Sequence, residues 1–447
     1  MMNMSKGKNT LDQSRSVLRA RVIAGISAGA LLTAFAWVSE VAAQEKLVVI
    51  GHKVHQIVST EGDGGDLGKQ WTAKTGVEVE WQTLPTAPLH EKMFREASLR
   101  ETTVGVAFLL NAQATPQRMK LFHPLNNLMA SKPLEDIDDI FKGMRDAMTL
   151  DGQLYAVPFR HATSAIHYNS AIWKERGITK VPENFEEWVD IVKQTSFTRS
   201  DGSKVYGFIM PGGGPRIYPT LVGMSRAFDG DFITLDYKCK ANEPGLVKAL
   251  TILKDFYDNG GIAKEFLSFR AEETNTWLTT GRVANSLASF GRTRFYNNPE
   301  NSKFPGEFKV LPVPSSRTVQ DRFKVAPINT EFWAMTIPAN YPNKDLAWDF
   351  IRHMASKEST LNAALNGNGP VRSSAYDSSA FQQKLPYAKH EQAALEFARV
   401  PLPPFNKASQ AMDILAEEVE AVMIGLKQPQ EAMDSTCRRV NPLLPKQ

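Results

Sequence analysis

The segment Asp151–Asn169, DGQLYAVPFRHATSAIHYN, constrains the fold of this 447-residue chain more than any other. It starts with an Asp-Gly pair, which is typical of a turn because Gly adopts positive φ and Asp bonds its own backbone. Two strand-like runs follow, Leu154–Val157 and Ser164–Tyr168, and Pro158 is expected to end the first because it lacks a backbone N–H. No tight-turn residues lie between the runs. The segment therefore indicates either a chain that passes from one folding unit to another or an irregular connection within one domain.

Three motifs lie in this segment and just after it: DG-x-L-YAVP with Tyr168-Asn169, then Trp173–Ile178 (WKERGI), then Pro182–Trp188 (PENFEEW). Their order and spacing resemble the extracellular solute-binding proteins of ABC importers, in particular the branch that includes maltose- and oligosaccharide-binding proteins. The resemblance extends over nearly all of residues 44–447. It implies an α/β fold, the two-lobed periplasmic-binding-protein fold (type II-like), in which each lobe is a sheet flanked by helices and a ligand cleft lies between the lobes.

The resemblance also implies that the chain passes between the lobes three times. The first passage follows Pro158, the second lies near Pro327–Thr330 and the third near Pro370–Arg372. These passages should act as hinges when the lobes close around a ligand. We therefore expect an N-terminal lobe of residues 44–160 plus 330–370 and a C-terminal lobe of residues 161–329 plus 371–447.

The β-branched run Lys46–Ile50 predicts a buried first strand, and Val104–Leu110 predicts another that ends at Asn111. After the first strand we expect a loop that contains His52 and continues to Asp66. A loop at the carboxyl end of a parallel strand is where open α/β sheets bind ligands. His52 and Asn111 are therefore candidate ligand residues.

Two helices have clear end signals in the sequence. Leu67–Lys74 is expected to be helical and to end at Gly76, since Gly tolerates the left-handed conformation that closes many helices. Asn184 and Glu187 have the spacing of a capping box and predict a helix start.

Flat aromatic rings and polar side chains suit a sugar, because a pyranose presents an apolar C–H face and a ring of hydroxyls. Aromatic residues lie at or next to several predicted strand ends and passages, although most aromatics in such a chain belong to the core. Ionisable side chains flank the passages, where they would bond hydroxyls, hold an anion or form ion pairs between the lobes. The predicted ligand-binding residues are His52, Trp81, Asn111, Phe159, Arg160, His161, Phe290, Trp333 and Arg372.

His52 and His55 offer two imidazoles, but no carboxylate or Cys completes a metal site there, so we expect no metal. The sequence has no HExxH or phosphate-loop motif, and GxSxG occurs only as Gly25–Gly29 (GISAG), inside the apolar run of the expected signal peptide. Its many carboxylates leave open a pair suited to glycoside hydrolysis. We therefore predict a protein that is not an enzyme and needs no cofactor, with an extracytoplasmic carbohydrate-active enzyme as an alternative.

Residues 1–43 have the layout of a secretory signal peptide. Basic residues precede the mostly apolar run Val22–Val38, and Val41-Ala42-Ala43 presents small residues to a signal peptidase. A membrane anchor is the alternative, but the apolar run is at the short limit for spanning a bilayer. No Cys lies directly after the run, which argues against a lipid-anchored form. We expect a periplasmic protein that begins at or near Gln44.

The net charge of +4 does not imply a nucleic-acid partner. Residues 1–43 carry five Lys and Arg against two Asp and Glu, and the rest of the chain carries 47 against 46. No basic face follows from so even a balance. The expected partners are a small solute and the permease subunits of an ABC transporter, and the protein is expected to be a monomer.

The chain has two cysteines, Cys239 and Cys437. In an oxidising compartment an even pair permits one disulfide, while two small buried residues would give the same pattern. The resemblance implies that the C-terminal segment packs on the second lobe, where the two could bridge. Taken together, we predict the periplasmic component of an ABC importer that binds a sugar or related polyol, with an anionic small solute as the main alternative.

Overall fold

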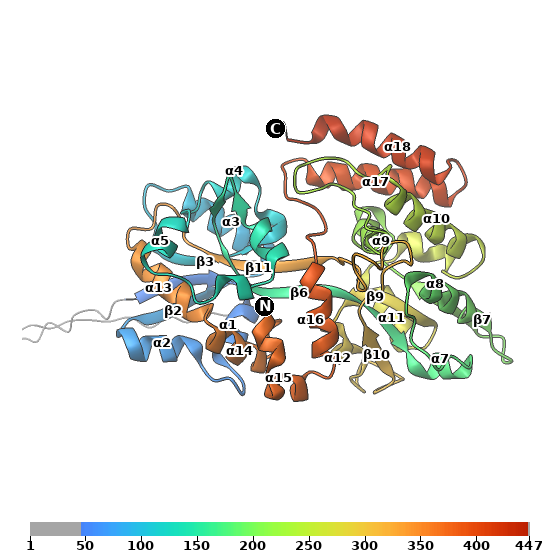
Figure 1. Cartoon of the computed structure of the whole chain (residues 1–447), viewed down its shortest axis with the longest axis horizontal. Coiled ribbons are helices and arrows are strands. Elements are labelled where there is room, and N and C mark those ends of the chain that lie inside the picture. Colours follow the sequence, from blue (N-terminus) through green and yellow to red (C-terminus); the bar gives the residue numbers. More distant parts are fainter. Residues whose placement is uncertain (1–45, 446–447) are drawn as a thin grey trace, which may run out of the picture. The chain divides into compact units, whose positions relative to one another are not determined.

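The computed structural model describes residues 46–445, so the expected signal peptide lies outside the described residues. The main sheet has nine strands in the order β2-β1-β3-β11-β6-β9-β8-β7, with β10 paired to β6, and helices flank it (Figure 1). A separate two-stranded sheet joins β4 (Thr149–Leu150) to β5 (Gln153–Leu154). The strands of the main sheet are β1 (Lys46–Gly51), β2 (Glu78–Thr83), β3 (Val104–Leu110), β6 (Val157–Asn169), β7 (Phe197–Thr198), β8 (Lys204–Ile209), β9 (Val283–Ser289), β10 (Phe308–Leu311) and β11 (Thr330–Thr336).

The helices account for most of the remaining regular structure. Within residues 46–445, no helix is both long and apolar enough to cross a membrane. The helices are α1 (Lys53–Thr60), α2 (Leu67–Thr75), α3 (Thr86–Ala97), α4 (Pro116–Met119), α5 (Asn126–Ser131), α6 (Lys142–Ala147), α7 (Ser170–Glu175), α8 (Phe185–Gln194), α9 (Ile217–Arg226), α10 (Pro244–Asp258), α11 (Ala271–Thr279), α12 (Arg292–Tyr296), α13 (Lys344–Met354), α14 (Lys357–Leu365), α15 (Ser379–Lys384), α16 (Ala388–Phe397), α17 (Ala408–Met423) and α18 (Pro429–Val440).

The end signals read from the sequence operate as expected. Gly76 closes α2 with a positive φ of 76°. The Asn184 side chain accepts a hydrogen bond from the Glu187 backbone N–H at 3.0 Å and so caps α8. These local rules place α2 between the parallel strands β1 and β2.

The predicted loop from His52 to Asp66 is wrong over its first half, because α1 begins directly after β1. His52 caps this helix: its Nδ1 accepts a hydrogen bond from the Val54 N–H at 3.2 Å. Nδ1 of His55 accepts the His52 N–H at 3.0 Å, which completes a reciprocal cap. In most capping boxes the side chains of Ser and Glu accept these backbone hydrogen bonds, and here two imidazole nitrogens accept them. The residue types at positions 52 and 55 therefore did not predict a helix start.

The prediction that Pro158 ends a strand is also wrong, since β6 runs unbroken from Val157 to Asn169. Its pairing with β11 shifts register at this point: Trp333 lies opposite Arg160, and Ala334 lies opposite Pro158. A shift of this kind tolerates a residue that cannot donate a backbone hydrogen bond. The polar interruption in the sequence is therefore part of one long strand.

Buried hydrophobic side chains form two large cores. The first combines residues between Leu47 and Phe159 with residues between Phe332 and Val400. The second combines residues between Ala165 and Ile328 with Ala394 and residues from Leu402 to Val440. Strand β6 contributes Phe159 to the first core and Ala165 to the second, so its central residues connect them.

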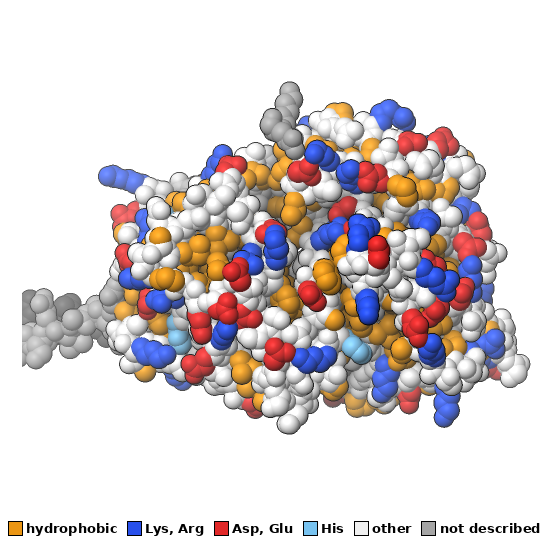
Figure 2. All heavy atoms as spheres, in the orientation of Figure 1, with side chains coloured by type: hydrophobic (Ala, Val, Ile, Leu, Met, Phe, Trp, Pro, Cys, Tyr) orange, Lys and Arg blue, Asp and Glu red, His pale blue; other side chains and the backbone are white. Residues whose placement is uncertain are grey.

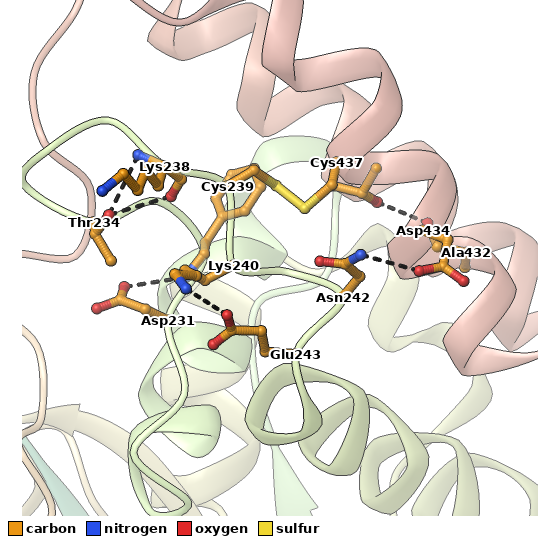
Figure 3. The surroundings of a disulfide bond; sticks show 12 residues. Asp231, Thr234, Lys238, Cys239, Lys240, Asn242, Glu243, Ala432, Asp434 and Cys437 are labelled. Atoms are coloured by element: carbon orange, nitrogen blue, oxygen red, sulfur yellow. Dashed lines mark hydrogen bonds and ion pairs between the residues drawn. A yellow bond between two sulfur atoms is a disulfide. The ribbon is translucent and has the colours of Figure 1, made fainter. Parts of the chain in front are cut away.

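The C-terminal helices α17 and α18 lie side by side and pack against α10 of the second core (Figure 1). Cys437 on α18 forms a disulfide with Cys239, which lies in the connection between α9 and α10, with 5.5 Å between their Cα atoms. A hydrogen bond of 3.1 Å from Asn242 Nδ2 to Asp434 Oδ1 joins the same two segments (Figure 3). The last helix is thus attached both covalently and by hydrogen bonding.

Candidate functional site

The two faces of the β6–β11 ladder carry different chemistry. Residues directly opposite one another in a ladder project to the same face, and successive residues along a strand alternate between faces. On one face the pairs are Arg160 with Trp333 and Ala162 with Glu331. On the other face the pairs are His161 with Phe332 and Thr163 with Thr330. We call the first the open face and the second the closed face.

Aromatic rings from several elements meet beside the open face. The imidazole of His55 on α1 stacks on Phe108 of β3 with 4.3 Å between ring centroids. It meets Trp333 of β11 edge-on at 4.8 Å. Trp81 of β2 stacks on Phe108 from another direction at 5.9 Å, and Phe159 meets Phe108 edge-on at 5.2 Å. We call these five residues the ring cluster.

Three buried nitrogens in and beside the ring cluster form no hydrogen bond within the described residues. They are Nε2 of His55, Nε1 of Trp81 and Nε of Arg160. A buried donor or acceptor without a partner costs about 1–3 kcal/mol, so native proteins rarely leave several of them together. Three of them beside aromatic faces form a place where a polar ligand would supply the missing partners.

The electrostatics of this region keep His55 neutral. Burial lowers the pKa of His55 well below its ordinary value, and the nearby charge of Arg160 lowers it further. A neutral imidazole whose Nδ1 accepts the backbone hydrogen bond from His52 carries its proton on Nε2. Nε2 of His55 is therefore a donor aimed away from the helix cap.

Arg160 and Glu331 are two opposite charges on the open face. Burial lowers the pKa of Arg160, and Glu331 opposes that effect. Glu331 is reached by solvent, yet the surrounding protein displaces enough water to raise its pKa, while Arg160 acts to lower it. Burial also raises the pKa of Tyr218 on α9 and Glu331 raises it further, so this helix of the second core lies within electrostatic reach of the same carboxylate.

The closed face holds a chain of buried hydrogen bonds. His161 Nδ1 lies 2.9 Å from Thr163 Oγ1, which lies 2.8 Å from Thr330 Oγ1. His161 Nε2 lies 2.9 Å from the hydroxyl of Tyr376, and that hydroxyl donates to Glu391 Oε2 at 3.1 Å. Burial lowers the pKa of His161 to about 3 and raises that of Glu391 to about 7. These groups fasten β6 and β11 to α16.

Five of the nine predicted ligand residues meet at the ring cluster. Trp81, Phe159 and Trp333 belong to it, His52 lies 6.3 Å from the His55 ring, and Arg160 acts on His55 electrostatically. Asn111 has a supporting position, since it is buried and its Oδ1 accepts the Phe332 N–H at 3.0 Å.

The other three predicted residues lie elsewhere, and we remove them from the candidate site. His161 occupies the closed face, because strand alternation turns it away from Arg160. Phe290 is fully buried in the second core and stacks on Tyr387 at 5.7 Å. Arg372 is fully buried too.

The Arg372 guanidinium is occupied by the protein itself. It donates to the backbone carbonyls of Ala355, Asp136 and Glu135 at 2.8, 2.7 and 2.6 Å, and it forms an ion pair with Asp139 at 3.3 Å. These contacts hold Arg372, which follows α14, against the connection between α5 and α6. All three nitrogens of the Arg372 guanidinium thus have partners within the protein.

Sequence reasoning missed Phe108, Glu331 and the role of His55. Phe108 lies in the middle of a buried strand and resembles any core residue. Glu331 could have been found, because it precedes Trp333 by two residues and strand periodicity puts both on one face. No group of three or more His, Cys, Asp and Glu side chains that could hold a metal ion occurs within residues 46–445.

The model of one protein family, described as bacterial extracellular solute-binding protein, matches residues 66–389. An erythritol/L-threitol-binding protein of Mycolicibacterium smegmatis is 25% identical over 347 residues, which cover 69% of this chain and 67% of the relative. An sn-glycerol-3-phosphate-binding periplasmic protein of Pectobacterium atrosepticum is 26% identical over 366 residues, covering 71% and 76%.

Solved structures of similar fold include two sugar- and polyol-binding proteins. The cyclic α-maltosyl-1,6-maltose-binding protein of Arthrobacter globiformis has a TM-score of 0.73 at 17% identity, with 89% of this chain and 98% of that chain covered. An ABC transporter solute-binding protein of Agrobacterium radiobacter in complex with ribitol has a TM-score of 0.66 at 19% identity, covering 89% and 98%. At this level of identity the similarity shows a shared fold.

Proposed function

The chain belongs to the family of bacterial extracellular solute-binding proteins, and we propose that it binds a sugar or related polyol between two hinged lobes and delivers it to an ABC importer. The family and the α/β periplasmic-binding-protein fold predicted from the sequence are both confirmed. The relatives and structural neighbours include a binding protein for erythritol and L-threitol, and ABC transporter solute-binding proteins in complex with ribitol and with D-mannitol. We propose three properties of this chain: the class of ligand that it binds, the position of its hinges, and its delivery of the ligand to a permease.

The observation that carries the proposal is the set of unpartnered nitrogens beside the ring cluster. His55 Nε2, Trp81 Nε1 and Arg160 Nε would donate to ligand hydroxyls. Trp81 and Trp333 would offer flat faces to the C–H surface of the ligand. Donors next to aromatic faces match a polyhydroxylated carbon chain or ring.

The charge of the open face favours a neutral ligand over an anion. One positive side chain, Arg160, is accompanied by one negative side chain, Glu331, and burial keeps the neighbouring His55 uncharged. An anionic solute remains the second candidate, because a relative is named for sn-glycerol 3-phosphate and Arg160 would be its partner.

We place the hinges where the chain leaves one core for the other. These are the middle of β6 around Phe159–Ala162, the segment before β11 around Pro327–Thr330, and the segment between Val400 and Leu402. The third position replaces Pro370–Arg372, because side chains from Val371 to Val400 belong mainly to the first core. Arg226 donates to the carbonyls of Pro327 and Val400 at 3.0 and 2.9 Å and so holds two of these segments together.

The remaining parts of the proposal follow from the family. The mature protein is a periplasmic monomer that begins near Gln44, binds without catalysing a reaction, and meets permease subunits when its lobes are closed. On the face drawn in Figure 2, Lys and Arg side chains are interspersed with Asp and Glu side chains. Such a surface lacks the single-signed field with which proteins attract nucleic acid.

The test is a thermal-shift screen of the exported protein against sugars, polyols, polyol phosphates and organic acids, followed by calorimetry. A ligand that binds only the folded state raises Tm. Trp333→Ala should weaken binding of the best hit about tenfold or more, whereas Trp277→Ala, on α11 of the second core, should leave it unchanged. A screen without any stabilising sugar or polyol, or product formation from a hit, would overturn the proposal.

A further inference from the structure

Arg160 and Glu331 occupy diagonal positions on the open face. Glu331 of β11 lies opposite Ala162 of β6. Arg160, two residues before Ala162, lies opposite Trp333, two residues after Glu331. Diagonal neighbours of an antiparallel ladder have Cα atoms about 7–8 Å apart, within reach of long side chains. Opposite charges in this arrangement would ordinarily form an ion pair.

These two side chains form no ion pair and no hydrogen bond with each other or with any residue from 46 to 445. They nevertheless influence each other, since each changes the pKa of the other in the direction expected for opposite charges. The guanidinium keeps its donors and the carboxylate keeps its acceptors. The open face therefore presents an unpaired donor group and an unpaired acceptor group within electrostatic reach of each other.

A neutral polyol fits this arrangement in a way that an anion does not. One hydroxyl accepts from the Arg160 guanidinium, and a neighbouring hydroxyl donates to the Glu331 carboxylate. A phosphate ester at the same place would gain from Arg160 but would be repelled by the negative charge of Glu331. The two charges therefore select against a charged ligand while they hold an uncharged one.

We propose that Glu331 is the specificity-determining residue of this site, restricting it to uncharged polyhydroxylated ligands by cancelling the charge of Arg160 and by accepting a ligand hydroxyl. This inference rests on the proposed solute-binding function and adds the chemical class that the site rejects. It is a discrimination that matters in this family, which includes a relative named for a phosphate ester and one named for uncharged tetritols.

The experiment compares Glu331→Gln with the wild type by calorimetry at one fixed ionic strength, with erythritol, sn-glycerol 3-phosphate and inorganic phosphate as probes. Gln keeps the size of Glu and removes its charge. Removing a unit charge about 7 Å from the anion, at an effective dielectric constant of about 20, should raise anion affinity on the order of 50-fold. Affinity for erythritol should fall, because the amide is a weaker acceptor than the carboxylate.

Two further variants test whether the change in anion affinity comes from Glu331 acting together with Arg160. Glu420→Gln removes the same charge from an exposed position on α17 and should leave both anions at wild-type affinity. Arg160→Met combined with Glu331→Gln should abolish the gain in anion affinity, because the gain acts through the guanidinium. Circular dichroism checks that each variant is folded.

The inference is overturned if Glu331→Gln binds both anions within twofold of Glu420→Gln, if it shows no measurable phosphate binding, or if the wild type binds sn-glycerol 3-phosphate more tightly than Glu331→Gln does. These outcomes are separate from failure of the proposed function. A screen without sugar or polyol hits, together with a gain of phosphate binding in Glu331→Gln, would reject the transport ligand and retain the charge rule. Polyol binding by the wild type, together with unchanged anion affinity in Glu331→Gln, would retain the proposed ligand and reject the role of Glu331.

Discussion

Replacing Glu391 by Gln should change how the stability of the protein depends on pH. Glu391 lies on α16 with its side chain buried, and its polar contact is the hydroxyl of Tyr376, which donates to Oε2 at 3.1 Å. Burial raises its pKa from 4.5 to about 7, and the hydrogen bond from Tyr376 opposes that rise. The folded protein therefore holds this proton at pH values where the unfolded chain has released it.

The sign and size follow from that difference. Because the folded-state pKa lies above the unfolded-state value, protonated Glu391 contributes its full stability below pH 4.5, and this contribution is lost as pH rises through about 7. A difference of 2.5 pKa units corresponds to about 3 kcal/mol at 1.36 kcal/mol per unit. Gln is neutral at every pH and still accepts from Tyr376, so Glu391→Gln should not lose this contribution.

Urea unfolding, followed by tryptophan fluorescence, measures the effect. The free energy of unfolding of the wild type minus that of Glu391→Gln should fall by about 3 kcal/mol between pH 4.5 and pH 8. The pKa of His161 is lowered to about 3, so its contribution to the stability of the protein is lost as pH falls below 6.5. His161 is present in both proteins, and its contribution cancels in the difference. Glu396→Gln, at an exposed position on the same helix, is the control and should give a flat difference. A difference for Glu391→Gln that changes by less than about 1 kcal/mol would refute the reasoning.

Three further predictions follow from the packing. Phe290→Ala should lower the free energy of unfolding by about 3–5 kcal/mol and leave ligand affinity unchanged, because the ring is fully buried in the second core; calorimetry that shows lost affinity in a stable variant would return Phe290 to the site. Replacing Cys239 and Cys437 by Ala should lower Tm, since a cross-link spanning 198 residues contributes up to about 5 kcal/mol by chain entropy; equal unfolding of the oxidised wild type and the double variant would contradict this. Arg372→Met should cost about 3–5 kcal/mol in urea unfolding without weakening binding, because it removes one partner of a buried ion pair; the opposite pattern would make Arg372 a ligand residue.

Much of the fold could be predicted from the sequence because it depends on local rules. Gly76 closes α2, and Asn184 caps α8, each through its own conformational or hydrogen-bonding preference. Helix α1 was missed because its cap is built by His52 and His55, whose residue type carries no such preference. The cap has the ordinary hydrogen-bond geometry, but its residue types are not those from which a helix start is recognised in a sequence.

The candidate site was harder to predict, because it depends on which face of one strand each residue occupies. Arg160 and His161 are adjacent in sequence and equally plausible as ligand residues, yet alternation separates them onto opposite faces. What assigns the faces is contact with residues far away in the chain, such as Tyr376, 215 positions from His161. Single-sequence patterns contain no information about that contact.

The place of β11 between β3 and β6 bears on the order in which the chain can be assembled during synthesis. Until Thr330–Thr336 has left the ribosome, β3 and the first half of β6 each present an unpaired edge, although both were made long before. The second core waits as well, because it needs side chains from Leu402 to Val440. Neither half can close early and wait for the other. The nascent chain therefore stays incompletely folded until nearly all of it has been translated. During that time chaperones can bind its unpaired strand edges.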